Sequence, residues 1–274
     1  MASHGTGSGA GLDTGSVRDD KADMRILVLG GTTEASGVVS ALSGRSDLDV
    51  TLSLAGRTSD PKRAPVPTRI GGFGGVAGLT EWLKANRSSL LVDATHPFAA
   101  TMSRNAAEAS DAAGVPLLIV RRPPWRREAG DRWIEVDTVP QAVTALGPTP
   151  RRVFLTIGRI ELGPFLGGAP QHSYVVRTIE PIAELVPPST KVSAIMGRGP
   201  FAATAEEALM AREKVDVLVT KNSGGEATYG KIAAARALGL PVVIVGQPEK
   251  PRVAAHVANA AEAVSWIDVH WPPP

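Results

Sequence analysis

Short apolar runs alternate along the chain with longer stretches in which apolar residues recur at helical spacing. In the first half, the runs predict strands at 25–29, 49–54, 68–70, 90–93 and 115–121. The stretches between them predict helices from about Thr33, at 76–86 and at 97–113, the last with Pro97 in its first turn. Strands that alternate with helices in this way are typical of βαβ units, so we expect a parallel sheet.

The alternation is interrupted at residues 121–127, which read Arg-Arg-Pro-Pro-Trp-Arg-Arg, and then resumes. Strands are predicted at 133–136, 152–157, 173–177, 191–196, 215–220 and 241–245, and helices at 139–146, 204–214, 229–238 and 253–265. Two prolines among four arginines favour a domain boundary at this interruption. The predicted fold class is therefore α/β, with two domains at 24–122 and 123–270 whose sheets face one cleft.

Composition narrows the classes of function. The chain has 274 residues, no cysteine, and 29 basic against 27 acidic residues. This balance, with aromatic residues at 4%, argues against a general nucleic-acid binder. No apolar stretch has the length of a membrane span, and the absence of cysteine makes the cytoplasm the expected compartment. Residues 1–23 lack the apolar region of a signal peptide, so we expect a disordered leader, and 271–274 form a short tail.

Polar turns follow three of the predicted strands. They read Gly-Gly-Thr-Thr-Glu at 30–34, Asp-Ala-Thr-His-Pro-Phe at 93–98 and Lys-Asn-Ser-Gly-Gly at 221–225. Open α/β sheets bind ligands at the carboxyl ends of their strands, so three such turns predict an enzyme site assembled from several loops. In the first turn, Gly30, Gly31 and Thr32 are expected to approach a cofactor, and Thr33 and Glu34 to face the substrate. A tight turn that binds nothing is equally compatible with the glycines.

Two further segments predict the cofactor. Arg57, with Thr58 or Ser59, follows the second strand, where an arginine suits the 2′-phosphate of NADPH; a solvated loop arginine is the alternative. The glycine-rich loop predicts a segment that faces the cofactor, or else a flexible turn with its aromatic residue in the core. Its candidate residues are Gly72, Phe73, Gly74 and Gly75.

The turn at 93–98 contains Thr95 and His96, which we expect to line the cofactor site. No serine elbow or cysteine accompanies them, so nucleophilic catalysis is not predicted. The histidines show no metal-ligand spacing, so no metal site is predicted. Thr95 is also a candidate cap for the helix expected from Pro97.

The turn at 221–225 combines a lysine, small donors and free amides before a helix. Lys221, Asn222, Ser223 and Gly224 therefore suit a substrate carboxylate, with Lys221 preferred as an anchor over a proton donor. Solvent-facing polar residues at a capped helix start are the alternative. Arginines recur at predicted strand ends and crossovers, which favours a polyanionic ligand: Arg57, Arg121, Arg122, Arg159, Arg177 and Arg198.

With these motifs in this order, from about Arg25 to Pro251, the chain resembles the precorrin-6A reductase family of cobalamin biosynthesis. The order also includes Ser-Leu-Ala-Gly-Arg at 53–57, Arg-Pro-Pro-Trp at 122–125 and Gly-Arg-Gly-Pro-Phe at 197–201. The resemblance implies two Rossmann-like domains with NADPH and a tetrapyrrole in the cleft. It also implies hydride transfer to the C18=C19 bond of precorrin-6A, giving precorrin-6B. The carboxylates of such a substrate agree with the predicted anion-binding residues, Arg198 among them.

Three alternatives compete with this function. A sister branch of the family acts on the cobalt-containing substrate, and the motifs do not fully exclude it. A non-catalytic nucleotide-binding module would use the same turns. A short-chain reductase requires a Tyr-x-x-x-Lys pair, but neither Tyr174 nor Tyr229 has a lysine four residues later.

Overall fold

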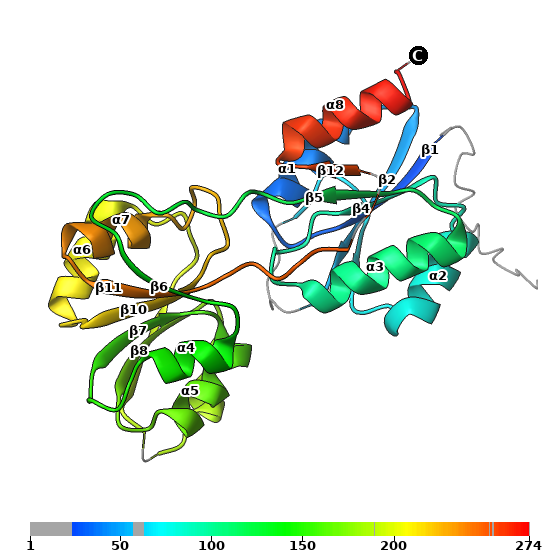
Figure 1. Ribbon diagram of the computed structural model, residues 1–274. Coiled ribbons are helices and arrows are strands. Elements are labelled where there is room, and N and C mark those ends of the chain that lie inside the picture. The colour runs from blue at the N-terminus through cyan, green and yellow to red at the C-terminus, as the bar shows by residue number, and fades with distance from the viewer. Residues whose placement is uncertain (1–23, 57–62, 189, 252, 254, 274) are drawn as a thin grey trace, which may run out of the picture.

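Two sheets of six strands each, joined by two connections of the chain, form the computed structural model of this protein (Figure 1). The structure describes residues 24–56, 63–188, 190–251, 253 and 255–273. The expected leader and the predicted cofactor residues Arg57 and Thr58 lie outside these residues. The α/β class with mainly parallel sheets is confirmed, because every strand pair described is parallel.

The first sheet has the order β12-β5-β4-β1-β2-β3. Its strands are β1 (Met24–Leu29), β2 (Leu48–Leu54), β3 (Thr68–Ile70), β4 (Leu90–Asp93), β5 (Leu117–Val120) and β12 (Ala255–Val257). Helices α1 (Thr33–Leu42) and α8 (Ala260–His270) cover one face, and α2 (Gly75–Ala85) and α3 (Ala100–Ala113) cover the other (Figure 1).

The second sheet has the order β6-β11-β10-β7-β8-β9. Its strands are β6 (Arg132–Val136), β7 (Arg152–Thr156), β8 (Ser173–Thr178), β9 (Val192–Met196), β10 (Val217–Lys221) and β11 (Pro241–Val245). Helices α4 (Val139–Ala145) and α5 (Leu162–Gly168) lie on one face, and α6 (Ala203–Arg212) and α7 (Gly230–Ala237) on the other. Two 3-10 turns, η1 (Arg159–Glu161) and η2 (Ala183–Leu185), complete the described elements.

The continuous apolar runs reflect burial on both faces of each sheet. In β1, Ile26 and Val28 pack into the core shared with α1 and α8, whereas Leu27 and Leu29 pack towards α2 and α3. A strand covered on both faces needs apolar residues at every position, which is why these runs show no alternation with polar residues.

The closing segment was predicted wrongly as a single helix over 253–265. Residues of β12 pair with β5 of the first sheet, with Ala255 opposite Leu118, and α8 starts only at Ala260. Asn259 begins that helix by accepting a hydrogen bond from the Glu262 amide. The chain therefore crosses back after β11, and β12 and α8 pack with the N-terminal sheet instead of closing the expected unit 123–270 (Figure 1).

The helix expected from Pro97 also starts later, at Ala100. Residues 96–99 form a turn in which the Ala99 amide donates to the His96 carbonyl at 2.8 Å. Thr95 does not cap this helix, because its hydroxyl donates to Asp93 Oδ1 at 2.6 Å. The buried carboxylate of Asp93 therefore binds the Thr95 hydroxyl that was predicted to cap the helix.

Candidate functional site

Each sheet has one place where its strand order reverses. In the first sheet the reversal lies between β1 and β4, and in the second between β7 and β10. The loops that follow such neighbouring strands diverge to opposite faces and leave a crevice in which α/β proteins bind ligands. The turns at 30–34, 93–98 and 221–225 all follow strands at these reversals.

Phe98 and Arg122 connect the two reversals. Phe98, from the loop after β4, packs against the core of the second sheet, and its ring centroid lies 5.0 Å from Lys221 Nζ at the end of β10. Arg122 Nη1 lies 2.9 Å from Glu34 Oε2 in α1, while Arg122 Nε donates to the Ser223 carbonyl at 2.7 Å. The carboxyl ends of both sheets therefore meet in one region, which we call the junction.

The first reversal is built on the turn after β1. Thr32 caps α1 by accepting from the Ala35 amide at 3.1 Å, and its hydroxyl donates to the Ala94 carbonyl at 2.7 Å. Gly31 has φ of 108°, and no atom lies within 4 Å of a Cβ built on it. The helix start is therefore open to an approaching group beside a backbone that only glycine readily adopts.

Asp93 anchors the loop after β4. It is fully buried; Oδ1 accepts from the amide and hydroxyl of Thr95, at 3.1 and 2.6 Å, and Oδ2 accepts from Ser103 Oγ at 2.5 Å. Lys250 Nζ, from the second connection, lies 3.4 Å from the same oxygen. Thr95 thus holds the shape of the loop that carries His96.

His96 is a neutral group at the junction. Its pKa is lowered to about 3, mainly by burial and also by the charges of Arg122, Lys221 and Lys231, while Glu34 opposes the shift. Its Nδ1 accepts from the Phe98 amide at 3.3 Å, which leaves the proton of the neutral ring on Nε2. His96 can therefore donate one hydrogen bond to a ligand without adding charge.

Lys221 is the last residue of β10 and is already paired. Its Nζ lies 2.5 Å from Glu161 Oε2, and only 16% of its side chain is exposed. The remaining residues of the turn hold the connection at 122–125: Asn222 exchanges hydrogen bonds with the backbone of Trp125, at 2.7 and 3.1 Å. A Cβ on Gly224 would lie 2.1 Å from the Pro123 carbonyl oxygen. Their binding to a substrate stays a prediction.

Arg122 and Glu34 form a partly buried ion pair, with 15% and 17% of their side chains exposed. Burial acts to raise the pKa of Glu34, but the Arg122 charge and hydrogen bonds outweigh it and hold that pKa below its ordinary value. Sequence patterns place both residues at strand ends but give no sign that they pair, because they are far apart along the chain.

The glycine-rich loop is ordered by Arg69, a residue that the sequence analysis missed. Arg69 donates to Ser53 Oγ and to the carbonyls of Gly71 and Gly72, at 2.9, 3.0 and 3.0 Å. Its guanidinium also stacks on the Phe73 ring, 3.7 Å from the centroid. The predicted strand at 68–70, which carries Arg69 just before the glycines, was the sequence signal that could have identified this residue.

Gly74 and Gly75 start α2 with φ of 81° and 87°, and no atom lies within 4 Å of a Cβ on either. The loop is therefore open on its outer side, as a segment facing a ligand must be. Of the predicted arginines, Arg198 is exposed, whereas Arg177 pairs with Glu206 at 2.6 Å and stacks on Phe201. Arg177 serves the packing of α6 against the sheet.

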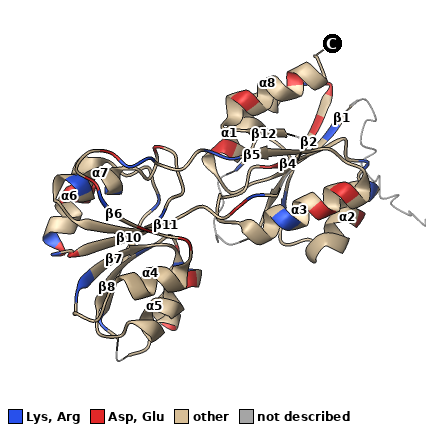
Figure 2. Ribbon diagram, viewed as in Figure 1, with Lys and Arg blue, Asp and Glu red and all other residues tan. Residues whose placement is uncertain are grey.

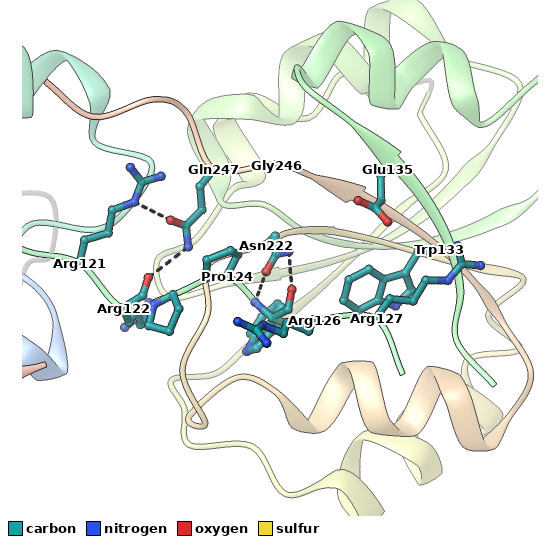
Figure 3. A pocket seen from close by; sticks show the side chains of 12 residues that line it. Arg121, Arg122, Pro124, Arg126, Arg127, Trp133, Glu135, Asn222, Gly246 and Gln247 are labelled. Carbon is teal, nitrogen blue, oxygen red and sulfur yellow. Dashed lines mark hydrogen bonds between the residues drawn. The ribbon is translucent and has the colours of Figure 1, made fainter. Parts of the chain in front are cut away.

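A cavity of about 580 Å³ lies beside the junction, between the two connections of the chain (Figure 3). Figure 2 shows basic residues along the connection from β5 towards β6, and these line much of the cavity. Arg121 ties the two connections together by donating to Gln247 Oε1 at 2.6 Å and to the Pro248 carbonyl at 2.7 Å. Asn222 links the cavity to the Lys221 turn.

Two features are absent from the part of the chain that the structure describes. Within that part of the chain, no group of three or more histidine, aspartate or glutamate side chains could hold a metal ion. None of the described helices is long and apolar enough to cross a membrane.

Known proteins resemble this chain over nearly its whole length. The family model "Precorrin-6x reductase CbiJ/CobK" matches residues 25–268. Precorrin-6A reductase of Sinorhizobium sp is 51% identical over 249 residues, covering 90% of this chain and 93% of the relative. Precorrin-6A reductase of Rhodobacter capsulatus is 44% identical, covering 90% and 96%. The solved structure "CobK precorrin-6A reductase" superimposes with a TM-score of 0.83 at 42% identity, covering 92% of this chain and 98% of that one.

Proposed function

The chain belongs to the precorrin-6x reductase family, and on that premise we propose that it reduces precorrin-6A to precorrin-6B with NADPH. The enzyme is an oxidoreductase that acts on a carbon–carbon double bond of a tetrapyrrole in cobalamin biosynthesis. The reaction adds one hydride and one proton, so the protein must hold two ligands against each other and exclude water.

The observation that carries this proposal is the meeting of the two strand-order reversals at the junction. One reversal offers glycine turns and a helix start, and the other carries cationic side chains. A nucleotide at the first and a polyanionic ring at the second would bring their reactive atoms together between Phe98, His96 and Arg122.

The residues at the first reversal fit a nicotinamide dinucleotide. The open helix start at Gly31 and Thr32 suits the pyrophosphate. The bare loop at Gly74 and Gly75, after the edge strand β3 of the same sheet, suits close approach of the ligand. When bound, the cofactor supplies the hydride. His96 would donate Nε2–H to a carbonyl or phosphate oxygen of a ligand beside it.

The preference for NADPH over NADH is proposed from the end of β2. Arg57 with Thr58 follows this strand, where a 2′-phosphate would lie. Arg69 lies in the neighbouring strand with its guanidinium on Ser53, at the end of β2. The charge of Arg69 beside the end of β2 supports a phosphate at this position.

Substrate carboxylates are proposed to bind Lys221, Arg198 and the neighbouring turn. Lys221 can exchange Glu161 for a substrate carboxylate without leaving its charge buried and unpaired. The metal-free substrate is favoured because the identity is 51% to a precorrin-6A reductase but 26% to the cobalt-precorrin-6A reductase of Salmonella typhimurium. The near-neutral, cysteine-free composition supports a cytoplasmic enzyme.

The test is NADPH oxidation by the purified protein with and without precorrin-6A, followed by mass analysis of the product. We expect oxidation only when precorrin-6A is present, a product heavier by two hydrogens, and a lower rate with NADH. Nucleotide binding with no turnover would identify a non-catalytic module instead. Turnover with cobalt-precorrin-6A alone would assign the chain to the cobalt branch.

A further inference from the structure

Lys231 is a buried lysine that the proposed binding roles do not use. It lies in the first turn of α7, the helix that follows the Lys221 turn along the chain, and is 7% exposed. Its Nζ lies 5.4 Å from the Trp125 ring centroid, so it lies beside the connection at 122–125. A lysine that only solvated the start of a helix would face outward.

The charged and titratable groups that interact electrostatically with Lys231 come from four elements around the junction. Arg177 in β8, Glu206 in α6, and Arg122 in the connection act on its charge, and Lys231 in turn acts on His96 after β4. Lys231 Nζ lies against the ring of Trp125, and the Trp125 amide donates to Asn222 Oδ1 in the turn after β10. Lys231 Nζ therefore lies at the edge of the second sheet where the junction is.

Lys231 differs from the other lysines of this region in its partners. Lys221 is paired with Glu161 at 2.5 Å and Lys250 with Asp93 at 3.4 Å. Glu206 is the acidic group whose charge acts on the pKa of Lys231, and it is already paired with Arg177 at 2.6 Å. Among the described residues, Lys231 is in no ion pair.

The pKa of Lys231 is lowered to about 7, mainly by burial, with the charges of Arg177 and Arg122 contributing to the shift and Glu206 opposing it. A general acid is most effective when its pKa lies near the working pH, because a large fraction is then protonated and the proton is still readily transferred.

We propose that Lys231 Nζ donates the proton that completes reduction of the macrocycle, an inference that rests on the proposed function. The nicotinamide hydride brings two electrons and forms a C–H bond at one carbon of the ring double bond. The other carbon takes the proton as the N–H bond of Lys231 breaks. The lysine is left as a neutral amine and regains a proton from water after the product forms.

The experiment compares Lys231→Met and Lys231→Arg with Lys191→Met, which changes an exposed lysine of the same half of the chain. Both Lys231 variants should lose about 100-fold or more in kcat, the usual contribution of a positioned acid, while KM for precorrin-6A changes less than threefold. Arginine keeps the positive charge but does not release its proton at neutral pH, so a residue that only bound a carboxylate would be rescued by it. Lys191→Met should behave as the wild type.

The pH dependence gives a second readout. An acid must be protonated to act, so wild-type kcat/KM should fall as pH rises through about 7, and this limb should be absent from the residual activity of Lys231→Arg. Retained kcat in Lys231→Met, rescue by arginine, or an unchanged pH limb would overturn the proposal.

A third readout needs no substrate and separates this inference from the function itself. In protein labelled with 13C at lysine Cε, one signal should titrate near pH 7 and be missing from Lys231→Arg. If every lysine titrates near 10, Lys231 is an ordinary cation and the proposal fails, even where NADPH-dependent turnover establishes the function. Circular dichroism of each variant checks that it is folded.

Discussion

Lys250 Nζ lies 3.4 Å from Asp93 Oδ2, and their side chains are only 4% and 0% exposed. The pair joins the second connection of the chain to the end of β4, and Asp93 also shapes the loop that carries His96. Burial lowers the pKa of Lys250, and the Asp93 charge opposes this shift. The position of the returning segment is thus tied to the loop at the first reversal.

We expect Asp93→Asn and Lys250→Met each to destabilise the protein by about 3–5 kcal/mol, because each leaves one buried charge without its partner. The double variant should cost clearly less than the sum of the two. Urea unfolding of the four proteins measures this coupling. Arg212→Ala, at a pair in which Arg212 is 68% exposed, is the control and should change stability by less than about 1 kcal/mol. Additive costs at Asp93 and Lys250 would show that the pair does not act as a unit.

Glu34→Gln should reduce the free energy of unfolding near neutral pH by about 1.5–3 kcal/mol, because it removes a charged partner of Arg122. The folded pKa of Glu34 is below its ordinary value, so this contribution is fully present above the ordinary glutamate pKa and is lost as pH falls through the folded pKa. Unfolding curves across the acidic range should therefore converge for wild type and variant. A difference that persists in strong acid would point to packing instead of charge.

Gly31→Ala tests the helix start proposed for the cofactor. Gly44 provides a matched control, since both glycines have positive φ, of 108° and 85°, and no atom lies within 4 Å of a Cβ on either. Both alanine variants should lose about 1 kcal/mol of stability from backbone strain. Only Gly31→Ala should raise the KM for NADPH, by about tenfold. Equal KM values for the two variants would make the Gly31 turn purely structural.

Arg57→Ala should raise the KM for NADPH by about tenfold or more and leave that for NADH nearly unchanged. The reason is loss of a charge-assisted bond to the 2′-phosphate, worth about 1.5–3 kcal/mol. Steady-state kinetics with both cofactors measure the difference, and Arg104→Ala on the exposed side of α3 is the control. A parallel rise for both cofactors would remove Arg57 from the ribose.

Lys221→Ala should raise the KM for precorrin-6A strongly while kcat and NADPH binding change little, because Lys221 is proposed to anchor a carboxylate. Glu161→Gln separates this role from the ion pair: it frees Lys221 and should leave substrate KM unchanged or lower it. A fall in kcat at constant KM in Lys221→Ala would instead assign proton transfer to Lys221.

Local pattern was sufficient for most elements, because a strand buried on both faces needs an unbroken apolar run. Residues 241–245, for example, form β11 with the predicted limits. It failed for β12, where a three-residue strand is defined by its partner β5 and not by its own composition. Pairing with β5 therefore makes residues 255–257 a strand, although their periodicity had predicted a helix.

The position of the candidate site could be predicted from the sequence, but the contacts of its side chains could not. Glycines and polar residues after apolar runs marked the turns that the structure places at the two reversals, since strand ends can be read from sequence. What each side chain binds could not be read: Asn222 holds Trp125, and Glu34 holds Arg122, across long separations in the chain. Lys231 lies on a helix of ordinary composition, and only its surroundings in the fold distinguish it.

Because the chain returns to its first sheet, the elements of that sheet are synthesised at two separate times. The outer edge of β5 and the apolar face of α1 are made early, but their covers, β12 and α8, are the last described elements to be synthesised. Ala263 and Ile267 of α8 are both fully buried in the core that contains Val38 and Leu42. The N-terminal half must therefore stay unfinished, with an open strand edge, until the C-terminal half has emerged and brought the closing segment back.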